Sequence, residues 1–269
     1  MDPVSHRETR TATLAPLIAW KDPRLSHGFL GRLGGVSQGP FAELNFSYLI
    51  GDEREAVDEN WRRLRELLPR GSRIARLHQV HGDVVRAVTA SEDGIVGEGD
   101  GLVTSDADVA LCVLSADCVP ILMADGEAGA VSAVHAGWRG VFADIATAGV
   151  RAMAAHGASP KRIRAALGPA IGACCFEVDE ELAEQFKQRF PNAANHLRKG
   201  KPGKGFVDLK GILRERLIAA GLAHDAITSV GPCTRCAADR FFSRRASADG
   251  RTGLQLSYIA LPGSALRES

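Results

Sequence analysis

The chain has 269 residues, 45% of them hydrophobic and 24% charged, so it can bury a large core without disulfides. Its 33 basic and 32 acidic side chains give a net charge of +1, which excludes the basic excess typical of nucleic acid binding. No stretch approaches the roughly 20 apolar residues of a membrane span, and residues 1–10 are too polar for a signal peptide. We therefore expect a cytoplasmic protein with reduced thiols and no nucleic acid or membrane partner.

The first part of the chain predicts a lead-in, a loop region and one helix. Residues 1–24 contain three prolines, and we expect them to be loosely ordered ahead of a single catalytic domain over residues 25–269. A glycine-rich stretch follows and predicts loops. In residues 53–68 apolar side chains recur every three or four positions, which predicts an amphipathic helix that ends at Pro69.

Short apolar runs dominate the rest of the chain and predict buried strands between helices. The predicted strands are 74–80, 84–88, 109–114, 119–123, 130–134, 163–167 and 254–260. The predicted helices are 141–155, 180–190 and 209–220, and residues 198–205 (RKGKPGKG) predict a flexible basic loop. Because strands and helices mix throughout, without an internal repeat, we expect one α/β (α+β) domain of layered sheets and helices.

Three segments place candidate metal ligands at the ends of apolar strands, where a rigid scaffold can aim side chains at one point. The segments are LHQVHG (77–82), SADCVP (115–120) and VHAGWRG (134–140), and the candidate ligands are His81, Cys118 and His135. Two imidazoles and one thiolate suit Zn²⁺, and three protein ligands leave a fourth position for water, as in catalytic sites. Spacing alone also allows simpler interpretations, in which each histidine is merely hydrogen-bonded and the cysteine is a small buried side chain.

Longer motifs around these residues resemble the YfiH-like family, also called laccase-domain or multicopper polyphenol oxidase-like proteins. The resemblance spans residues 27–260. Its motifs are GGVSQGPFAELNFSYLIGDE (34–53), QVHG (79–82), DGLVT (100–104), SADCVPIL (115–122), AVHAGWRG (133–140), GPAIGACCFEV (168–178) and FFSRRASADGRTG (241–253). Several long motifs in a fixed order are far more specific than any one short pattern.

The resemblance implies a YfiH-like α/β/β/α sandwich and zinc held by His81, Cys118 and His135. It also implies purine nucleoside phosphorylase activity on adenosine, inosine and methylthioadenosine, accompanied by adenosine deaminase activity. The partners would then be a small-molecule nucleoside and phosphate, while the oligomeric state stays open. The laccase name points to copper instead, but the chain lacks the several His-x-His pairs that suit a multicopper cluster, so we favour zinc.

Three further residues are candidates for binding substrate or phosphate. Arg139 lies in a glycine-bracketed turn before a predicted helix, and Arg32 precedes a pair of glycines. Both could bind phosphate, because helix N-termini and guanidinium groups favour anions, although each could equally form a surface salt bridge. Asn45 could donate a hydrogen bond to the substrate.

Two residues next to the candidate ligands could take part in the chemistry. Asp117 could orient a ligand or move protons, although on a strand it would point away from Cys118. His78 would point away from His81 on a continuous strand, but it could line the pocket if the strand ends early.

The remaining cysteines form a vicinal pair, Cys174 and Cys175, and a Cys-x-x-Cys motif at Cys233 and Cys236, besides Cys112. A vicinal pair is poor geometry for joint tetrahedral ligation, and one Cys-x-x-Cys motif lacks the second half of a zinc site. We therefore interpret these cysteines as buried or free thiols.

Two other functions fit the same residues. A cysteine hydrolase would use Cys118 as nucleophile and His135 as base without metal, and a related variant would edit peptidoglycan precursors by removing a wrongly attached amino acid. A non-enzymatic binding or redox protein is the third possibility, and it predicts no turnover of any nucleoside.

Overall fold

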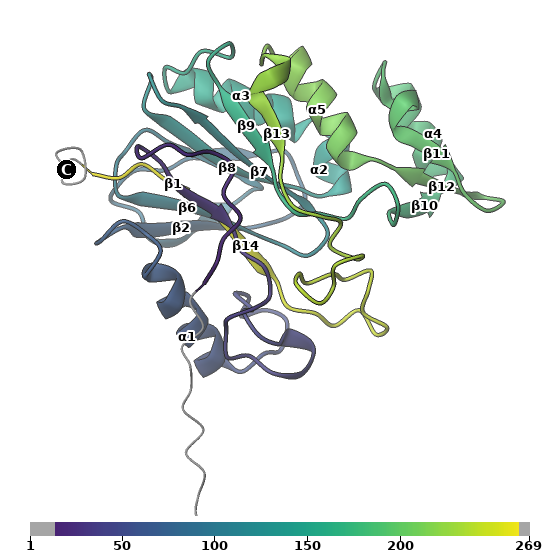
Figure 1. Cartoon of the computed structure of the whole chain (residues 1–269). Coiled ribbons are helices and arrows are strands. Elements are labelled where there is room, and N and C mark those ends of the chain that lie inside the picture. Colours follow the sequence, from purple (N-terminus) through teal and green to yellow (C-terminus); the bar gives the residue numbers. More distant parts are fainter. Residues whose placement is uncertain (1–13, 264–269) are drawn as a thin grey trace, which may run out of the picture.

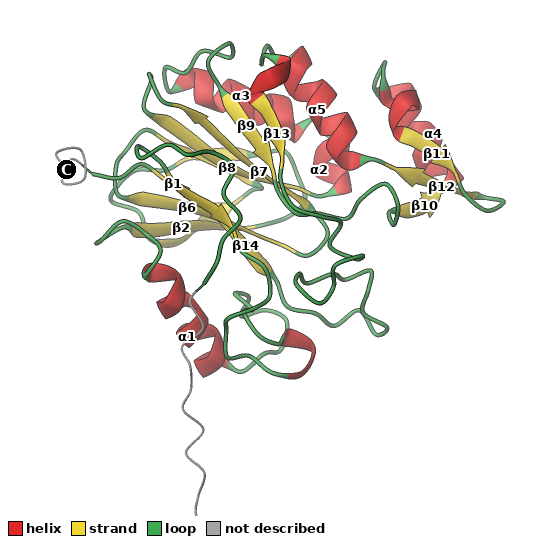
Figure 2. Cartoon of the chain, in the orientation of Figure 1, coloured by secondary structure: helices red, strands yellow, loops and turns green. Residues whose placement is uncertain are grey.

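Two β-sheets packed face to face form the centre of the molecule, and helices cover the outer face of each sheet (Figures 1 and 2). The structure is a computed structural model, and it describes residues 14–263. The five-stranded sheet has the order β1 (Ser26–Phe29), β14 (Gln255–Ala260), β6 (Val109–Ser115), β2 (Arg73–His78) and β4 (Gly94–Glu98). The six-stranded sheet has the order β13 (Ile227–Ser229), β9 (Arg164–Leu167), β7 (Val119–Asp125), β8 (Ala130–Ala136), β5 (Gly101–Thr104) and β3 (Val85–Ala87).

Helix α1 (Arg54–Arg65) covers the five-stranded sheet, whereas α2 (Trp138–Phe142), α3 (Ile145–Ala155) and α5 (Leu209–Ala219) cover the six-stranded sheet (Figure 1). A small third sheet of β10 (Glu177–Asp179), β12 (Lys204–Val207) and β11 (Leu197–Lys199) lies beside α4 (Glu180–Arg189). Three short 3₁₀ helices complete the described chain, at Gly39–Phe41, Ala193–His196 and His224–Ala226. The layers confirm the α/β/β/α sandwich expected from the sequence.

Three hydrophobic clusters fill the spaces between the four layers. On β6, Leu111 and Val113 belong to the cluster between the sheets, whereas Ala110 and Cys112 belong to the cluster that includes residues of α1. This alternation follows from the two-residue period of a strand, and it explains why such strands are unbroken apolar runs in the sequence.

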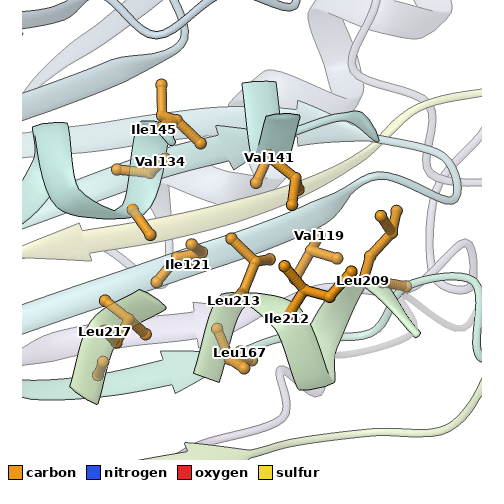
Figure 3. Close-up of a cluster of buried hydrophobic side chains, with 14 of the residues drawn as sticks. Val119, Ile121, Val134, Val141, Ile145, Leu167, Leu209, Ile212, Leu213 and Leu217 are labelled. Carbon is orange, nitrogen blue, oxygen red and sulfur yellow. The ribbon is translucent and has the colours of Figure 1, made fainter. Parts of the chain in front are cut away.

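The largest of the three clusters lies between the six-stranded sheet and its helices (Figure 3). Ile121 on β7 and Leu213 on α5 are fully buried there. Each fully buried side chain of this kind stabilises the fold by about 1.5–3 kcal/mol relative to leaving it exposed. The sheet that carries two of the three candidate ligands is therefore well anchored.

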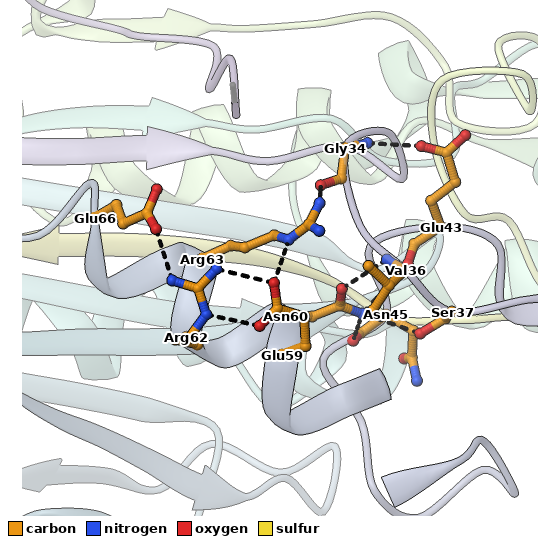
Figure 4. A network of polar contacts seen from close by, with 10 residues as sticks. All are labelled: Gly34, Val36, Ser37, Glu43, Asn45, Glu59, Asn60, Arg62, Arg63 and Glu66. Atoms are coloured by element: carbon orange, nitrogen blue, oxygen red, sulfur yellow. Dashed lines mark hydrogen bonds and ion pairs between the residues drawn. The ribbon is translucent and has the colours of Figure 1, made fainter. Parts of the chain in front are cut away.

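A polar network joins α1 to the loop before it (Figure 4). The buried Asn60 side chain donates to the carbonyl oxygens of Glu43 and Asn45 at 3.2 and 2.8 Å, and its oxygen accepts from the Val36 amide at 3.0 Å. Arg63 donates to the Gly34 carbonyl at 2.7 Å. These bonds hold the loop that leads into one wall of the site.

The structure corrects two predicted elements. The helix predicted over 141–155 is two helices, because Asp144 takes a left-handed conformation with φ of 70° and forms an ion pair with Arg216. Residues 198–205, expected to be a flexible loop, lie in a hairpin in which Arg198 pairs with Phe206. Burial alternates along β12, where Gly205 and Val207 are buried, as expected for a strand with one face packed. The basic residues of this segment hid that alternation in the sequence.

The lead-in is more firmly attached than we expected where the structure describes it. The backbones of Leu17 and Phe29 exchange two hydrogen bonds of 2.9 and 3.0 Å, and Asp22 forms an ion pair with Arg164 at 2.7 Å. The rest of the lead-in, residues 1–13, lies outside the described residues. Within residues 14–263, none of the helices has the length and apolar character needed to cross a bilayer.

Candidate metal centre

His81, Cys118 and His135 meet at one edge of the sandwich. One potential ligand atom of each lies within 4.8 Å of those of the other two. His135 is part of β8, opposite Pro120 of β7, and Cys118 directly precedes β7. His81 lies beyond the end of β2 in a turn where its own φ is 63°. The three segments singled out in the sequence therefore converge on one point.

Asp100 orients two of these ligands. It is fully buried and its Oδ1 lies 2.8 Å from Nδ1 of His135, which directs the other ring nitrogen, Nε2, toward the site. The same carboxylate accepts hydrogen bonds from the backbone amides of His81 at 3.0 Å and Gly82 at 2.7 Å. A carboxylate behind a ligating histidine is a recurrent feature of metal sites, since it fixes the tautomer and makes the imidazole a better donor.

The electrostatics of the site favour a thiolate beside charged imidazole. Burial raises the pKa of Cys118, but attraction to His135 and hydrogen bonds from His135 and His81 outweigh it and lower the pKa to about 6. Burial lowers the pKa of His135, whereas the neighbouring Cys118 and Asp100 raise it to about 9. A thiolate is the form of cysteine that binds metals.

The donor set and the space around it fit a metal ion. Two imidazole nitrogens and a thiolate suit Zn²⁺, and no fourth donor from His, Cys, Asp or Glu joins the group among the described residues. Gly137 makes room, because a Cβ there would lie 2.6 Å from Cδ2 of His81 and 3.2 Å from Sγ of Cys118. This close approach explains the glycine in the AVHAGWRG motif.

The three side chains line a cavity of about 390 Å³. Apolar side chains, among them Leu49, Ile95 and Leu254, form much of its wall. Arg76 and Arg244 also line it. A volume of this size and a wall of this character are typical of small-molecule sites.

Two polar groups in the cavity wall lack partners within the described part of the chain. The hydroxyl of Ser115 is buried and forms no hydrogen bond there. Arg76 is half-buried, forms no ion pair with any described carboxylate, and lies over the Trp61 ring at 5.3 Å. Since buried polar groups are normally hydrogen-bonded, the guanidinium of Arg76 is available to an anion, whereas the Ser115 hydroxyl lies beneath the surface of the wall.

Of the other predicted site residues, only His78 lines the cavity. Strand β2 ends at His78, so the chain turns before His81 and both histidines face the same space. Asp117 instead accepts hydrogen bonds from the Thr234 hydroxyl at 2.6 Å and the Arg245 amide at 2.8 Å. Its carboxylate therefore fixes the chain next to Cys118 rather than facing the cavity.

Arg32, Asn45 and Arg139 do not line the cavity. Arg32 donates to the carbonyl oxygens of Ala42 and Ala238 at 2.7 and 2.8 Å, and Arg139 is exposed and lies over the Trp138 ring. Asn45 is fully buried, and its side chain joins Ser47, Asp52 and Leu254. Its bonds shape the wall, because Ser47 and Leu254 both line the cavity.

Our sequence analysis missed Asp100, Arg76 and Arg244. Asp100 begins the DGLVT motif and Arg244 lies in FFSRRASADGRTG, so the motifs contained the signal without assigning a role. Arg76 carried no signal, since it lies in an apolar run that predicts a strand.

The remaining cysteines are free thiols or buried, as expected, but four of them lie unexpectedly close together. Cys174, Cys175, Cys233 and Cys236 form a second group whose sulfur atoms all lie within 4.8 Å of one another. Cys175 and Cys236 are 61 positions apart in the sequence, and this separation hid their proximity. Only the fold brings the two loops together.

The fold is a mixed α/β sandwich with a His-Cys-His group in a cavity, and these two features define the class to which the protein belongs. The family model described as multi-copper polyphenol oxidoreductase laccase matches residues 26–262, and the chain belongs to this family. Among solved structures, YlmD from Geobacillus stearothermophilus matches with a TM-score of 0.85 and 36% identity, covering 90% of this chain and 94% of that one. Bacillus licheniformis hypothetical protein YfiH matches with a TM-score of 0.84 and 30% identity, covering 88% and 92%.

Similar proteins carry the name of an enzyme. The purine nucleoside phosphorylase YlmD of Geobacillus stearothermophilus is 38% identical over 243 residues, which cover 86% of this chain and 88% of that protein. A purine nucleoside phosphorylase of Deinococcus radiodurans is 37% identical over 253 residues, covering 94% and 95%. These names support an enzyme that acts on a nucleoside and phosphate.

Proposed function

We propose that the protein is a zinc-dependent purine nucleoside phosphorylase that also deaminates adenosine. It would act on adenosine, inosine and methylthioadenosine in the cytoplasm. The observation that carries this proposal is that His81, Cys118 and His135 line one cavity together with Arg76, which forms no ion pair with a carboxylate of residues 14–263. The names of the similar proteins support the phosphorylase part of this proposal.

The apolar wall of the cavity suits a purine base. Leu49 and Ile95 line the cavity and are 77% and 48% exposed, so their apolar surface could pack against a planar base. The imidazole of His78 supplies a hydrogen-bonding group that could fix the orientation of the nucleoside.

Arg76 is our candidate for the phosphate ligand. Burial lowers the pKa of its guanidinium, because a charged group loses hydration there, and binding an anion would restore the lost interaction. Arg244, exposed at the edge of the same cavity, would add a second positive charge. Arg32 and Arg139, first suggested for this role, would serve only if the protein rearranged on binding.

Phosphorolysis requires phosphate to attack C1′ of the ribose. A phosphate oxygen forms a bond to C1′, the bond from C1′ to the base nitrogen breaks, and that nitrogen takes up the proton of hydrogen phosphate. The products are the free base and ribose-1-phosphate. The part of the protein would be to align the phosphate with C1′ and to exclude water, which gives a large rate advantage over reaction in solution.

His81, Cys118 and His135 would hold the zinc ion. Asp100 would keep the proton of the His135 imidazole on Nδ1, so that the lone pair of Nε2 is free to bind the metal. When bound there, zinc supplies a Lewis acid that polarises an oxygen of the substrate or of water. The latter chemistry would account for deamination, in which water replaces the amino group of adenosine and ammonia leaves. His78 lines the cavity and would exchange protons with a bound substrate in this proposal.

A metal-free cysteine hydrolase is the second candidate. The hydrogen bond between His135 and Cys118 resembles the pairing of base and nucleophile in such enzymes, including one that edits peptidoglycan precursors. The two candidates differ in one property, because the hydrolase would work without metal and would be inactivated by alkylation of Cys118.

The test combines metal analysis with product analysis on untagged protein. Bound metal is measured by mass spectrometry, and adenosine is followed by chromatography with and without phosphate. We expect zinc in the protein, adenine only when phosphate is present, and inosine in both cases. Turnover of neither kind by the zinc-loaded protein would refute the nucleoside assignment, and full activity after zinc removal would favour the hydrolase.

A further inference from the structure

Four cysteines on two distant loops form a compact group of sulfur atoms. Cys174 and Cys175 lie between β9 and β10, whereas Cys233 and Cys236 lie between β13 and β14 (Figure 1). Sγ of Cys236 is 3.7 Å from Sγ of Cys174 and 3.4 Å from Sγ of Cys175, and all four sulfurs lie within 4.8 Å of one another. None of the four forms a disulfide.

We propose that Cys174, Cys175, Cys233 and Cys236 bind one structural zinc ion as a tetrathiolate. In a zinc site with Zn–S bonds of about 2.3 Å, tetrahedral geometry places the sulfurs about 3.8 Å apart. The separations from Cys236 to Cys175 and Cys174, 3.4 and 3.7 Å, lie close to that edge length. The group is too tight for a cluster of several iron atoms, in which the thiolates bind different irons and must spread further apart.

Both loops are built to bring the sulfurs together. The Gly172 amide donates to Sγ of Cys233 at 3.2 Å, a contact that stabilises a negative sulfur. A Cβ at Gly172 would lie 3.2 Å from Cβ of Cys233 and 3.3 Å from Sγ of Cys174, so the glycine permits the close approach. Ala170 pairs with Cys233 as a β-bridge, and its carbonyl oxygen accepts from the Thr234 amide at 3.0 Å.

The segment that follows the group gives a reason for a metal there. Residues 230–254 contain no strand or helix, yet Arg244, Thr252 and Leu254 from this segment line the cavity. A connection of that length without regular structure needs an anchor if it is to position a binding site. A metal ion that ties four side chains together supplies folding free energy to the loops that carry them.

A hydrogen bond connects this anchor with the catalytic site. Thr234, inside the Cys-x-x-Cys motif, donates to Asp117, and Asp117 is the neighbour of Cys118. The tetrathiolate would therefore fix both one wall of the cavity and the turn that presents a ligand of the first metal. It would not touch the substrate, so its role is structural.

The number of zinc ions per chain tests the proposal. Full-length protein is purified under reducing conditions with zinc supplied, and its zinc content is measured for the wild type, Cys236→Ser, His81→Ala and Cys112→Ala. We expect two zinc ions in the wild type, one in each of the first two variants, and two in Cys112→Ala. Cys112 is a matched control, since it is a buried cysteine that belongs to neither group.

Cobalt substitution identifies the ligands without relying on a variant that folds. Co²⁺ bound by four thiolates gives an intense thiolate-to-metal charge-transfer absorption, whereas a site with one thiolate gives a much weaker one. We expect the intense absorption in wild-type and His81→Ala protein. A single zinc per wild-type chain that is lost in His81→Ala and kept in Cys236→Ser would overturn the proposal. A disulfide among the four cysteines of freshly isolated protein would also overturn it. Because His81→Ala separates the sites, failure of the phosphorylase assignment would leave this result unchanged.

Discussion

The two groups of candidate ligands are built in opposite ways. His81, Cys118 and His135 come from the ends of sheet strands, and two of them have a buried carboxylate, Asp100, behind them. The four-cysteine group comes from two loops and is solvent-exposed at Cys174 and Cys236. The first group has three donors beside a cavity, and the second has four donors with no position left for a substrate.

The difference in construction indicates that the first group serves catalysis and that the second stabilises the fold. A metal with three protein ligands keeps a position for a reacting molecule, and rigid strands hold that position steady. A metal with four thiolates is closed, and it contributes stability to chain segments that have little hydrophobic core of their own. Variants that affect one group and spare the other test whether the distinction holds.

Substituting His81→Ala should have the largest effect on activity. Replacing a residue that only orients a metal ligand typically lowers metal affinity or activity by about 10- to 100-fold. Losing a ligand itself should therefore reduce kcat/KM for adenosine and phosphate by more than about 100-fold. Steady-state kinetics beside a zinc assay would measure this. Cys236→Ser serves as the counterpart, and the distinction fails if that variant loses activity as completely as His81→Ala while keeping its fold by circular dichroism.

Substituting Asp100→Asn should weaken zinc binding at the first group by about 10- to 100-fold. The amide could donate to Nδ1 of His135 and place the ring proton on Nε2, the nitrogen that should bind the metal. Competition with a chelator measures the affinity. Asp83→Asn, an exposed carboxylate nearby, is the control, and equal affinities for the two variants would contradict an orienting role for Asp100.

Substituting Arg76→Met should raise KM for phosphate by about 10- to 100-fold, the value of a hydrogen bond to a charged group. Methionine keeps much of the packing against Trp61, so KM for the nucleoside should change less. Initial rates over a range of phosphate concentrations give both constants. If Arg139→Met produces the larger change, the phosphate site lies at the α2 turn instead.

Substituting Thr234→Val should have the smallest effect on catalysis, because it removes only the link between the groups. The Asp117 carboxylate loses the hydrogen bond of 2.6 Å that the Thr234 hydroxyl donates to it. Losing a hydrogen bond to a charged acceptor should cost about 1.5–3 kcal/mol of stability. Denaturant unfolding of zinc-loaded protein measures this loss. We expect both zinc ions to remain, and loss of the first zinc would mean that the two groups are not separate.

Local patterns predicted the long strands of both sheets and most of the helices, but not the short strands β1, β4, β5, β10 and β13. Residues 53–68 have a clear helical period and contain α1, and the apolar runs of β6 and β7 are strands buried on both faces. Two predicted elements differ in the structure, because tertiary contacts decide them. Asp144 breaks a helix where Arg216 binds it, and the basic residues after Leu197 are held in a hairpin by pairing with β12.

The site residues that lie in recognisable motifs could be predicted from the sequence. Residues that are far apart in the chain and meet only in the fold could not. Each of the three candidate ligands lies at a strand end within a motif, so their convergence could be expected. Asp100 needed the fold, because only the pairing of β5 with β8 brings it to His135. The four-cysteine group was missed for the same reason, since a vicinal pair gives no sign of its partners 61 residues away.

Anomalous diffraction at the zinc absorption edge, on crystals of protein that has not been treated with chelator, tests the central claim most directly. The account predicts a peak bonded to His81, Cys118 and His135 at about 2.0–2.3 Å, with its fourth position facing the cavity. A second peak should lie among the four cysteines. Absence of the first peak in zinc-loaded protein, or a fourth protein side chain bound to that ion, would contradict the account.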